Sequence, residues 1–292
     1  MEEYRTSLSL GIHNRQKKIA AVNDMTGFGR CSLAASIPII SRLGVQCCAV
    51  PTAILSNHTG FDSFFFDDYT GRFQAYTDEW KKLGLRFAGI LTGFLSSAAQ
   101  FGLVEQFLTD FAVPGTIVCV DPVMGDYGTI YSSYTDEMCH AMRALVRRAH
   151  IITPNLTEAC ILTDLSYHEG VWRKRELEEL MSRLHALGPE KIVITGIPQG
   201  EFIANLSREG EGSLSLTRQH RVGQQRSGTG DVFASVIATD AVNGVEFARS
   251  VRHASAFVKK CILRSIELDI PATDGVCFEE VLGELRKESS ST

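Results

Sequence analysis

The sequence predicts an α/β protein whose central sheet is mostly parallel and carries an antiparallel hairpin at one edge. Three observations predict this class. Short apolar runs rich in β-branched residues alternate with longer segments of helical periodicity, as in chains whose parallel strands are joined by crossover helices. Hydrophobic residues make up 44% of the 292 residues and charged residues 22%, which is the balance of a chain that buries a core. Two short alternating runs within 202–217 surround a glycine-containing turn, which is typical of a hairpin.

The elements follow in order from their local patterns. Apolar and β-branched residues predict strands over 18–22, 45–50, 87–91, 116–120, 150–153 and 191–195. Between these runs, apolar residues recur at intervals of three and four and predict helices over 97–111, 136–148 and 173–187. After the hairpin, the sequence predicts further helices over 230–242, 245–264 and 278–286.

Residues 51–70 contain turn formers and aromatic residues too densely for a regular helix, and we expect a mobile flap there. No Pro-, Gly- or Ser-rich linker and no internal repeat divides the sequence, which predicts one domain over 1–292. Residues 1–16 are expected to form an N-terminal extension, and residues 287–292 a frayed tail.

Charge and cysteine content narrow the class of function. The net charge of -5 provides no general basic field for a polyanion, so we expect small-molecule substrates and no nucleic-acid partner. The eight cysteines lack the spacings of C-x-x-C redox motifs and zinc sites, so we expect free thiols. No apolar run is long enough for a signal peptide or a membrane helix, so we expect a cytoplasmic protein with no membrane partner.

The strongest local signal for chemistry is SGTGD at 227–231, directly before an apolar helical run. Glycines before a helix free backbone N–H groups to converge on an anion, and the helix dipole adds positive potential at the same point. The alternative is an ordinary helix start, in which Asp231 caps the helix or offsets its dipole. The motif needs support from elsewhere in the chain before it indicates a site.

Polar residues at three other strand ends supply that support. The first strand is followed by NDMTGFG, the strand over 116–120 by DPVMGD, and the strand over 150–153 by PNLTE. Ligands of parallel sheets bind outside these carboxyl ends. The two carboxylates of DPVMGD suit a hydrated Mg²⁺, and Glu158 either reaches a metal-bound water or simply lies in the first turn of a helix. Together these loops supply the groups that phosphoryl transfer from a nucleotide requires, namely carboxylates for Mg²⁺ and a glycine loop for phosphate. P-loop and protein-kinase motifs are absent from the sequence.

Four motifs carry a resemblance to a known family. SNHT at 56–59, DPVMGD at 121–126, TPNLTE at 153–158 and GTGDVFAS at 228–235 occur in the order seen in pyridoxal kinases of the ribokinase-like superfamily. The resemblance spans about residues 17–250. GTGD and TPN-x-x-E mark the superfamily broadly, whereas SNHT is more particular to the pyridoxal and pyridoxamine kinase branch. The segment NDMTGFGRCSL resembles a bacterial pyridoxamine kinase variant.

The resemblance implies a ribokinase-like, three-layer α/β/α domain that uses MgATP to phosphorylate the 5′-hydroxymethyl group of a B6 vitamer. Such enzymes serve the salvage of pyridoxal 5′-phosphate, usually as homodimers, and a need for K⁺ or another monovalent cation stays open. Asp231 would be the catalytic base, and the amides of Gly228, Thr229 and Gly230 would form the anion hole. The remaining implied roles are Asp121 and Glu158 at the metal, Asp126, Asn155, Thr195, Gly228 and Gly230 at ATP, and Thr52 and His58 at the vitamer ring.

Two departures concern the substrate. Asp24 stands where pyridoxal kinases commonly have a serine, and Phe94 stands where many have a ring-packing tyrosine. We hypothesise that Asp24 pairs with a protonated pyridine nitrogen or with the 4′-ammonium group of pyridoxamine. Its alternative role is to cap the turn before Met25.

Other functions remain open at this stage. A hydroxymethylpyrimidine kinase of thiamine synthesis shares DPVM and the glycine loop, although SNHT disfavours it. A sugar kinase is disfavoured because the first strand end lacks D-x-x-x-G-G. A catalytically silent vitamer-binding regulatory protein would gain nothing from Asp231, since a carboxylate beside a phosphate loop weakens anion binding.

Overall fold

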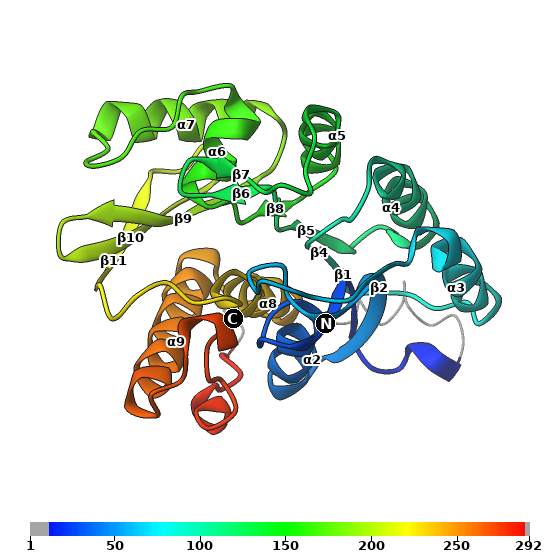
Figure 1. Cartoon of the computed structure of the whole chain (residues 1–292). Coiled ribbons are helices and arrows are strands. Elements are labelled where there is room, and N and C mark those ends of the chain that lie inside the picture. The colour runs from blue at the N-terminus through cyan, green and yellow to red at the C-terminus, as the bar shows by residue number, and fades with distance from the viewer. Residues whose placement is uncertain (1–11, 290–292) are drawn as a thin grey trace.

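A nine-stranded sheet forms the centre of the computed structural model, which describes residues 12–289 (Figure 1). In sheet order, the strands are β11 (Ser215–His220), β10 (Phe202–Glu209), β9 (Lys191–Gln199), β8 (Ile151–Ile152), β5 (Ile117–Val120), β4 (Gly89–Thr92), β1 (Lys18–Phe28), β2 (Gln46–Asn57) and β3 (Phe66–Asp68). The strands from β9 to β2 pair in parallel, whereas β10, β11 and β3 pair antiparallel at the two edges. The predicted parallel sheet with an edge hairpin is therefore confirmed.

Helices cover both faces of this sheet (Figure 1). One layer consists of α3 (Thr70–Lys82), α4 (Ala98–Phe111), α5 (Asp136–Val146), α6 (Leu156–Thr163) and α7 (Lys174–Ala186). The other layer consists of α2 (Ser32–Arg42), α8 (Thr229–Asn243) and α9 (Phe247–Glu267). Short 3-10 turns lie at Ile12–Asn14, Ala272–Asp274 and Leu282–Glu284, and a separate ribbon pairs β6 (Gly125–Asp126) with β7 (Thr129–Ile130). The three-layer α/β/α arrangement is confirmed.

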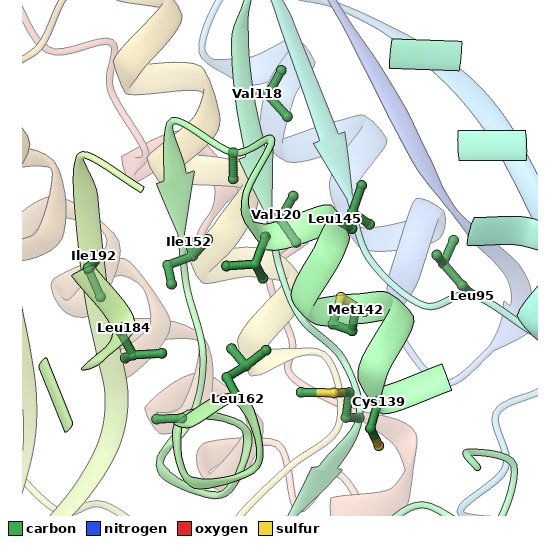
Figure 2. Packing of buried hydrophobic residues seen from close by; sticks show 14 of the residues in the cluster. Leu95, Val118, Val120, Cys139, Met142, Leu145, Ile152, Leu162, Leu184 and Ile192 are labelled. Atoms are coloured by element: carbon green, nitrogen blue, oxygen red, sulfur yellow. The ribbon is translucent and has the colours of Figure 1, made fainter. Parts of the chain in front are cut away.

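Alternate strand residues build two hydrophobic cores, because successive side chains of a strand point to opposite faces. On β1, Ala20 and Val22 pack toward the layer of α3 to α7, whereas Ile19 and Ala21 pack toward α2, α8 and α9. Figure 2 shows part of the first core, where strand residues face the helices. The side chains in this view include Val118, Val120, Ile152 and Ile192 from the sheet, and Met142, Leu145, Leu162 and Leu184 from α5, α6 and α7. Both strand faces are apolar because both are buried.

Several element boundaries differ from the predictions. Residues 278–286 form only a 3-10 turn and not the predicted helix. Phe278, Val281 and Leu285 are buried because this irregular segment docks on the second core, and their spacing resembles that of a helix. The flap over 51–70 was predicted too long, since β2 continues to Asn57 and β3 begins at Phe66. β1 likewise runs beyond Val22 to Phe28. Helices α2 and α3 were not predicted.

Some predictions concern residues at the ends of the chain. Most of the expected N-terminal extension, residues 1–11, and positions 290–292 of the expected tail lie outside the described residues. All eight cysteines are described and are free, as expected. Within residues 12–289, no helix has the length and apolar character needed to cross a bilayer.

Candidate active site

A cavity of about 650 Å³ opens at the carboxyl ends of the parallel strands. Its wall combines residues in or after β1, β2, β4, β5, β8 and β9 with the first residues of α8. Motifs far apart in sequence meet here because the strand ends share one edge of the sheet. The predicted site residues that line the cavity are His58, Phe94, Asp121, Asp126, Asn155, Glu158, Thr195, Gly228, Thr229, Gly230 and Asp231.

The glycine loop before α8 is held in one conformation. Gly228 is the N-cap of α8 and has a φ of 80°, in the left-handed region that favours glycine. A Cβ atom on Gly228 would lie 2.0 Å from the backbone oxygen of Arg30, so no larger residue fits without displacement. The first N–H groups of α8 lack helical acceptors and carry the positive end of the helix dipole. The loop therefore has the geometry of an anion site on the cavity wall.

Asp231 lies in the first turn of α8, half-buried in the cavity wall. Its Oδ1 accepts a hydrogen bond of 3.0 Å from the side-chain amide of Asn23. Burial, together with the charge of Asp24, raises the pKa of Asp231 to about 6, although hydrogen bonds from the Ser32 backbone and from Asn23 act in the opposite direction. A carboxylate with this pKa is mostly ionised at neutral pH and can accept a proton.

Two further carboxylates, Asp121 and Glu158, line the same cavity. Asp121 follows β5, accepts a 2.8 Å hydrogen bond from the Thr153 hydroxyl, and has its Oδ2 3.8 Å from the position of a Cβ on Gly230. Burial and the charge of Asp231 raise the pKa of Asp121, and burial and the charge of Asp121 raise the pKa of Glu158. Neighbouring carboxylates that repel one another are stabilised by a hard divalent cation, and carboxylate oxygens are the donors that Mg²⁺ prefers. The donor set fits Mg²⁺, although the described residues contain no preformed cluster of three metal-ligating side chains.

Asn155 and Glu158 also hold the start of α6 in a capping box. Asn155 Oδ1 accepts from the Glu158 backbone at 2.9 Å, and Glu158 Oε2 accepts from the Asn155 backbone at 2.8 Å. Asn155 Nδ2 donates to the carbonyl of Gly125 at 2.8 Å, which joins α6 to the DPVMGD loop. The helix-start interpretation of Glu158 is thus correct, and the same side chain lines the cavity.

Asp126 and Thr195 also line the cavity. Asp126 accepts hydrogen bonds from its neighbour Tyr127 at 2.9 Å and from the side chain of Gln225, which connects β6 to the loop before α8. Burial raises the pKa of Asp126. The Thr195 backbone donates to the carbonyl of Pro154 at 2.8 Å. These contacts fix Asp126 on β6 and Thr195 on β9.

Of the residues predicted to bind a vitamer, His58 and Phe94 line the cavity and Asp24 and Thr52 do not. The Thr52 side chain is fully buried, and its hydroxyl donates to the Phe94 carbonyl at 2.9 Å. Asp24 is 5% exposed and accepts a 2.5 Å hydrogen bond from the Thr26 hydroxyl. Burial raises the pKa of Asp24. The Thr52 side chain therefore lies behind Phe94, and the Asp24 carboxyl group is buried beside Thr26.

Residues 270–274, which we call the C-terminal strap, accept hydrogen bonds from three loops of the site. The backbone N–H of Gly60 donates to His58 Nδ1 at 3.0 Å, so Nε2 carries the proton that His58 donates to the Thr273 carbonyl at 2.6 Å. Arg226 donates to the carbonyls of Ile270 and Pro271 at 2.7 Å and 3.1 Å. Arg30 donates to the carbonyl of Asp274 at 3.1 Å.

Sequence reasoning missed the roles of two residues in this site. Asn23 was recognised only as a polar residue at a strand end, and its contact with Asp231 spans 208 positions. Arg226 was not noticed, yet it is buried, lines the cavity and directly precedes the glycine loop. The only sequence signal for either was its place, an amide at the end of an apolar strand and a cation one residue before SGTGD.

A family model for phosphomethylpyrimidine kinase matches residues 32–273. The chain belongs to this kinase family. The resemblance to ribokinase-like kinases is thereby confirmed, and relatives within the family carry the name pyridoxal kinase. A pyridoxal kinase of Ovis aries is 30% identical over 232 residues, which cover 70% of each chain. A pyridoxal kinase of Deinococcus radiodurans is 28% identical over 232 residues, covering 75% of this chain and 77% of its own.

A solved structure of a family member has nearly the same fold. It is a Bacteroides thetaiotaomicron protein, provisionally assigned as a phosphomethylpyrimidine kinase, crystallised with pyridoxal. It is 36% identical, covers 93% of this chain and 96% of its own, and superposes with a TM-score of 0.89.

Proposed function

We propose that this kinase transfers the γ-phosphoryl group of ATP to the 5′-hydroxymethyl group of a B6 vitamer, as in the salvage of pyridoxal 5′-phosphate. One observation carries the proposal: Asp231 stands on the cavity wall in the same helical turn that begins with the glycine loop. A base and an anion site side by side are what an alcohol attacking a phosphoryl group requires. The relative crystallised with pyridoxal supports the vitamer as substrate.

The reaction follows from these two groups. Asp231 accepts the hydroxyl proton as the vitamer oxygen forms its bond to the γ-phosphorus and the bond to the β-phosphate oxygen of ATP breaks. Its pKa of about 6 keeps it ionised at neutral pH and makes it a stronger base than an exposed aspartate. The backbone amides of Gly228, Thr229 and Gly230 stabilise the negative charge on the transferring group, and each such donor is worth ~3 kcal/mol in comparable anion holes.

ATP would lie along the wall that contains Asp126, Asn155 and Thr195, with its phosphates toward Gly228 and Gly230. Asp121 and Glu158 would hold Mg²⁺, directly or through water, and bound Mg²⁺ neutralises charge on the phosphates. The raised pKa values of both carboxyl groups support this role, since a nearby cation would favour their ionised forms.

The vitamer ring would lie against His58 and Phe94. Thr52 supports this wall through the Phe94 carbonyl. We propose that Asp24, a buried carboxyl group whose ionised form a nearby cation would favour, selects a vitamer with a protonated pyridine nitrogen or a 4′-ammonium group. The chain would form one domain and act as a homodimer.

A second candidate is phosphorylation of hydroxymethylpyrimidine, the unphosphorylated form of the pyrimidine for which the matching family model is named. The cavity groups described above serve either alcohol, because the attacking hydroxymethyl group is the same. ADP release decides between them when the protein is incubated with MgATP and, in parallel, pyridoxamine, pyridoxal, pyridoxine and hydroxymethylpyrimidine.

Asp231→Asn is the matched control for the chemistry. It is expected to lower kcat by ~10²-fold or more while leaving ATP affinity nearly unchanged, because the side chain keeps its size and loses its basicity. Turnover retained in this variant would remove Asp231 as the base. Absence of turnover with every alcohol in the wild-type protein would refute the proposed function itself.

A further inference from the structure

We propose that Asn23 is a positioning residue whose side-chain amide holds the carboxylate of Asp231 in its working orientation. The catalytic consequence rests on the proposed function, whereas the contact between the two side chains does not. Asn23 itself touches no reacting atom in this proposal, because it acts through Asp231.

The hydrogen bonds of Asn23 determine which way its amide points. Its Oδ1 accepts from the backbone N–H groups of Asp24 and Phe94, both at 2.9 Å. Only an oxygen can accept two N–H donors, so the NH₂ group must point the other way. There it donates to Asp231 Oδ1 at 3.0 Å. Asn23 as a whole residue is 7% exposed, so water competes little for these bonds.

The sheet brings Asn23 to this point. The pairing of β1 with β4 ends at Val22 and Thr92, and Asn23 is the first residue beyond it. The register between β1 and β2 shifts between Asn23 and Met25. Such irregularities redirect side chains next to active sites. Asn23 thus leaves the regular ladder where β1 approaches the start of α8.

Gly93 leaves the space that the Asn23 side chain occupies. A Cβ atom on Gly93 would lie 2.4 Å from Asn23 Nδ2 and 2.6 Å from its Cγ. The φ of Gly93 is outside the left-handed region, so space and not backbone conformation requires glycine here. Because three hydrogen bonds fix Asn23, it cannot move aside easily, and a methyl group on Gly93 would disturb its contact with Asp231.

The hydrogen bond favours the ionised form of Asp231, which is the form that accepts a proton. Its loss should therefore raise the pKa of Asp231, and the acid limb of the activity profile should move to higher pH. Asn23→Asp is the sharpest test, because the new oxygen still accepts from Asp24 and Phe94 while the donor toward Asp231 becomes a like charge.

The first experiment compares Asn23→Asp with the wild type and with Asn243→Asp. Asn243 is also buried and donates to a backbone carbonyl, that of Leu43 at 3.1 Å, and it does not line the cavity. The carboxyl carbon of Asp231 is titrated by ¹³C NMR, assigned by its loss in Asp231→Asn. We expect the Asp231 pKa to rise by more than about one unit in Asn23→Asp and to stay unchanged in Asn243→Asp. An unchanged titration in Asn23→Asp would overturn the proposal.

Kinetics then show whether the contact matters for turnover. We expect Asn23→Asp to lose about tenfold or more in kcat near pH 6 and to recover part of it above pH 8, with a smaller change in KM. A purely structural role would lower activity equally at all pH values, and that result would also overturn the proposal. If the wild type transfers no phosphoryl group, the proposed function fails, and the NMR titration still decides the role of Asn23.

A double-mutant cycle with Gly93→Ala gives an independent test. In the wild-type background this change should lower kcat about tenfold, because the methyl group meets Asn23. In Asn23→Ala the obstructing side chain is absent, so Gly93→Ala should lower kcat less than about threefold in that background. Equal losses in both backgrounds would contradict coupling through Asn23.

Discussion

Gly228→Ala tests whether the glycine loop is as constrained as its contacts indicate. Two separable effects lower the stability of the folded variant. The first is conformational, since φ is 80° and a non-glycine residue in the left-handed region costs ~1–2 kcal/mol. The second is steric, since the Cβ would lie 2.0 Å from the Arg30 backbone oxygen, and overpacking of this kind costs ~1–3 kcal/mol.

Gly115→Ala is the matched control for the conformational cost. Gly115 has a φ of 90°, and a Cβ on it would meet no atom within 4 Å. The free energy of unfolding of Gly115→Ala should therefore fall by only ~1–2 kcal/mol. At roughly 2–4 °C per kcal/mol for a chain of this size, the steric cost of ~1–3 kcal/mol should make Gly228→Ala melt about 2–12 °C below the control.

The assay is thermal unfolding of both variants, followed by ADP release at a temperature where each is folded. Gly228→Ala should also lose kcat, because the anion loop must shift to relieve the contact with Arg30. Equal melting temperatures for the two variants would refute the steric argument. Full activity in a destabilised Gly228→Ala would refute the role of the loop in catalysis.

Three further predictions concern the carboxylates. Asp231→Asn should be inactive yet more stable than the wild type at pH 8. The folded pKa of Asp231, about 6, lies above the ~3.9 of an unfolded aspartate, so the wild-type protein loses stability as the pH rises through this window. The melting curves of the variant and the wild type should coincide below about pH 4. Asp24→Asn should lower kcat/KM for pyridoxamine more than for pyridoxal, and equal losses would contradict the preference for a cationic vitamer. Asp121→Asn should raise the Mg²⁺ concentration needed for half-maximal ADP release, whereas an unchanged Mg²⁺ dependence would argue against metal binding at Asp121.

The sequence predicted the parts of the fold whose signals are local. The strands over 116–120 and 150–153 are short apolar runs between helices, and GTGD, DPVMGD and TPN-x-x-E lie at strand ends where the sheet gathers them. The predicted helix over 278–286 failed because apolar residues three and four apart also arise when an irregular segment docks on a core. Local periodicity does not distinguish these two cases.

The orientation of individual side chains was beyond sequence reasoning. Asp24 and Thr52 lie in strands that reach the cavity, yet their side chains are buried and do not line it. The contact between Asn23 and Asp231 depends on where the pairing of β1 with β4 stops and on the space left by Gly93. Such contacts depend on tertiary geometry, and a motif records only the residue types that take part.

The C-terminal strap has a consequence for the order in which the protein matures. Arg30, His58 and Arg226 all donate to carbonyls between Ile270 and Asp274, although the sheet is already complete at His220. A ribosome releases all strands of the sheet before it releases these acceptors, so the three loops gain their C-terminal contacts only at the end of synthesis. Termination a few codons before Ile270 would therefore leave the loops of Arg30, His58 and Arg226 without these acceptors, and it would also remove Phe278, Val281 and Leu285 from the second core.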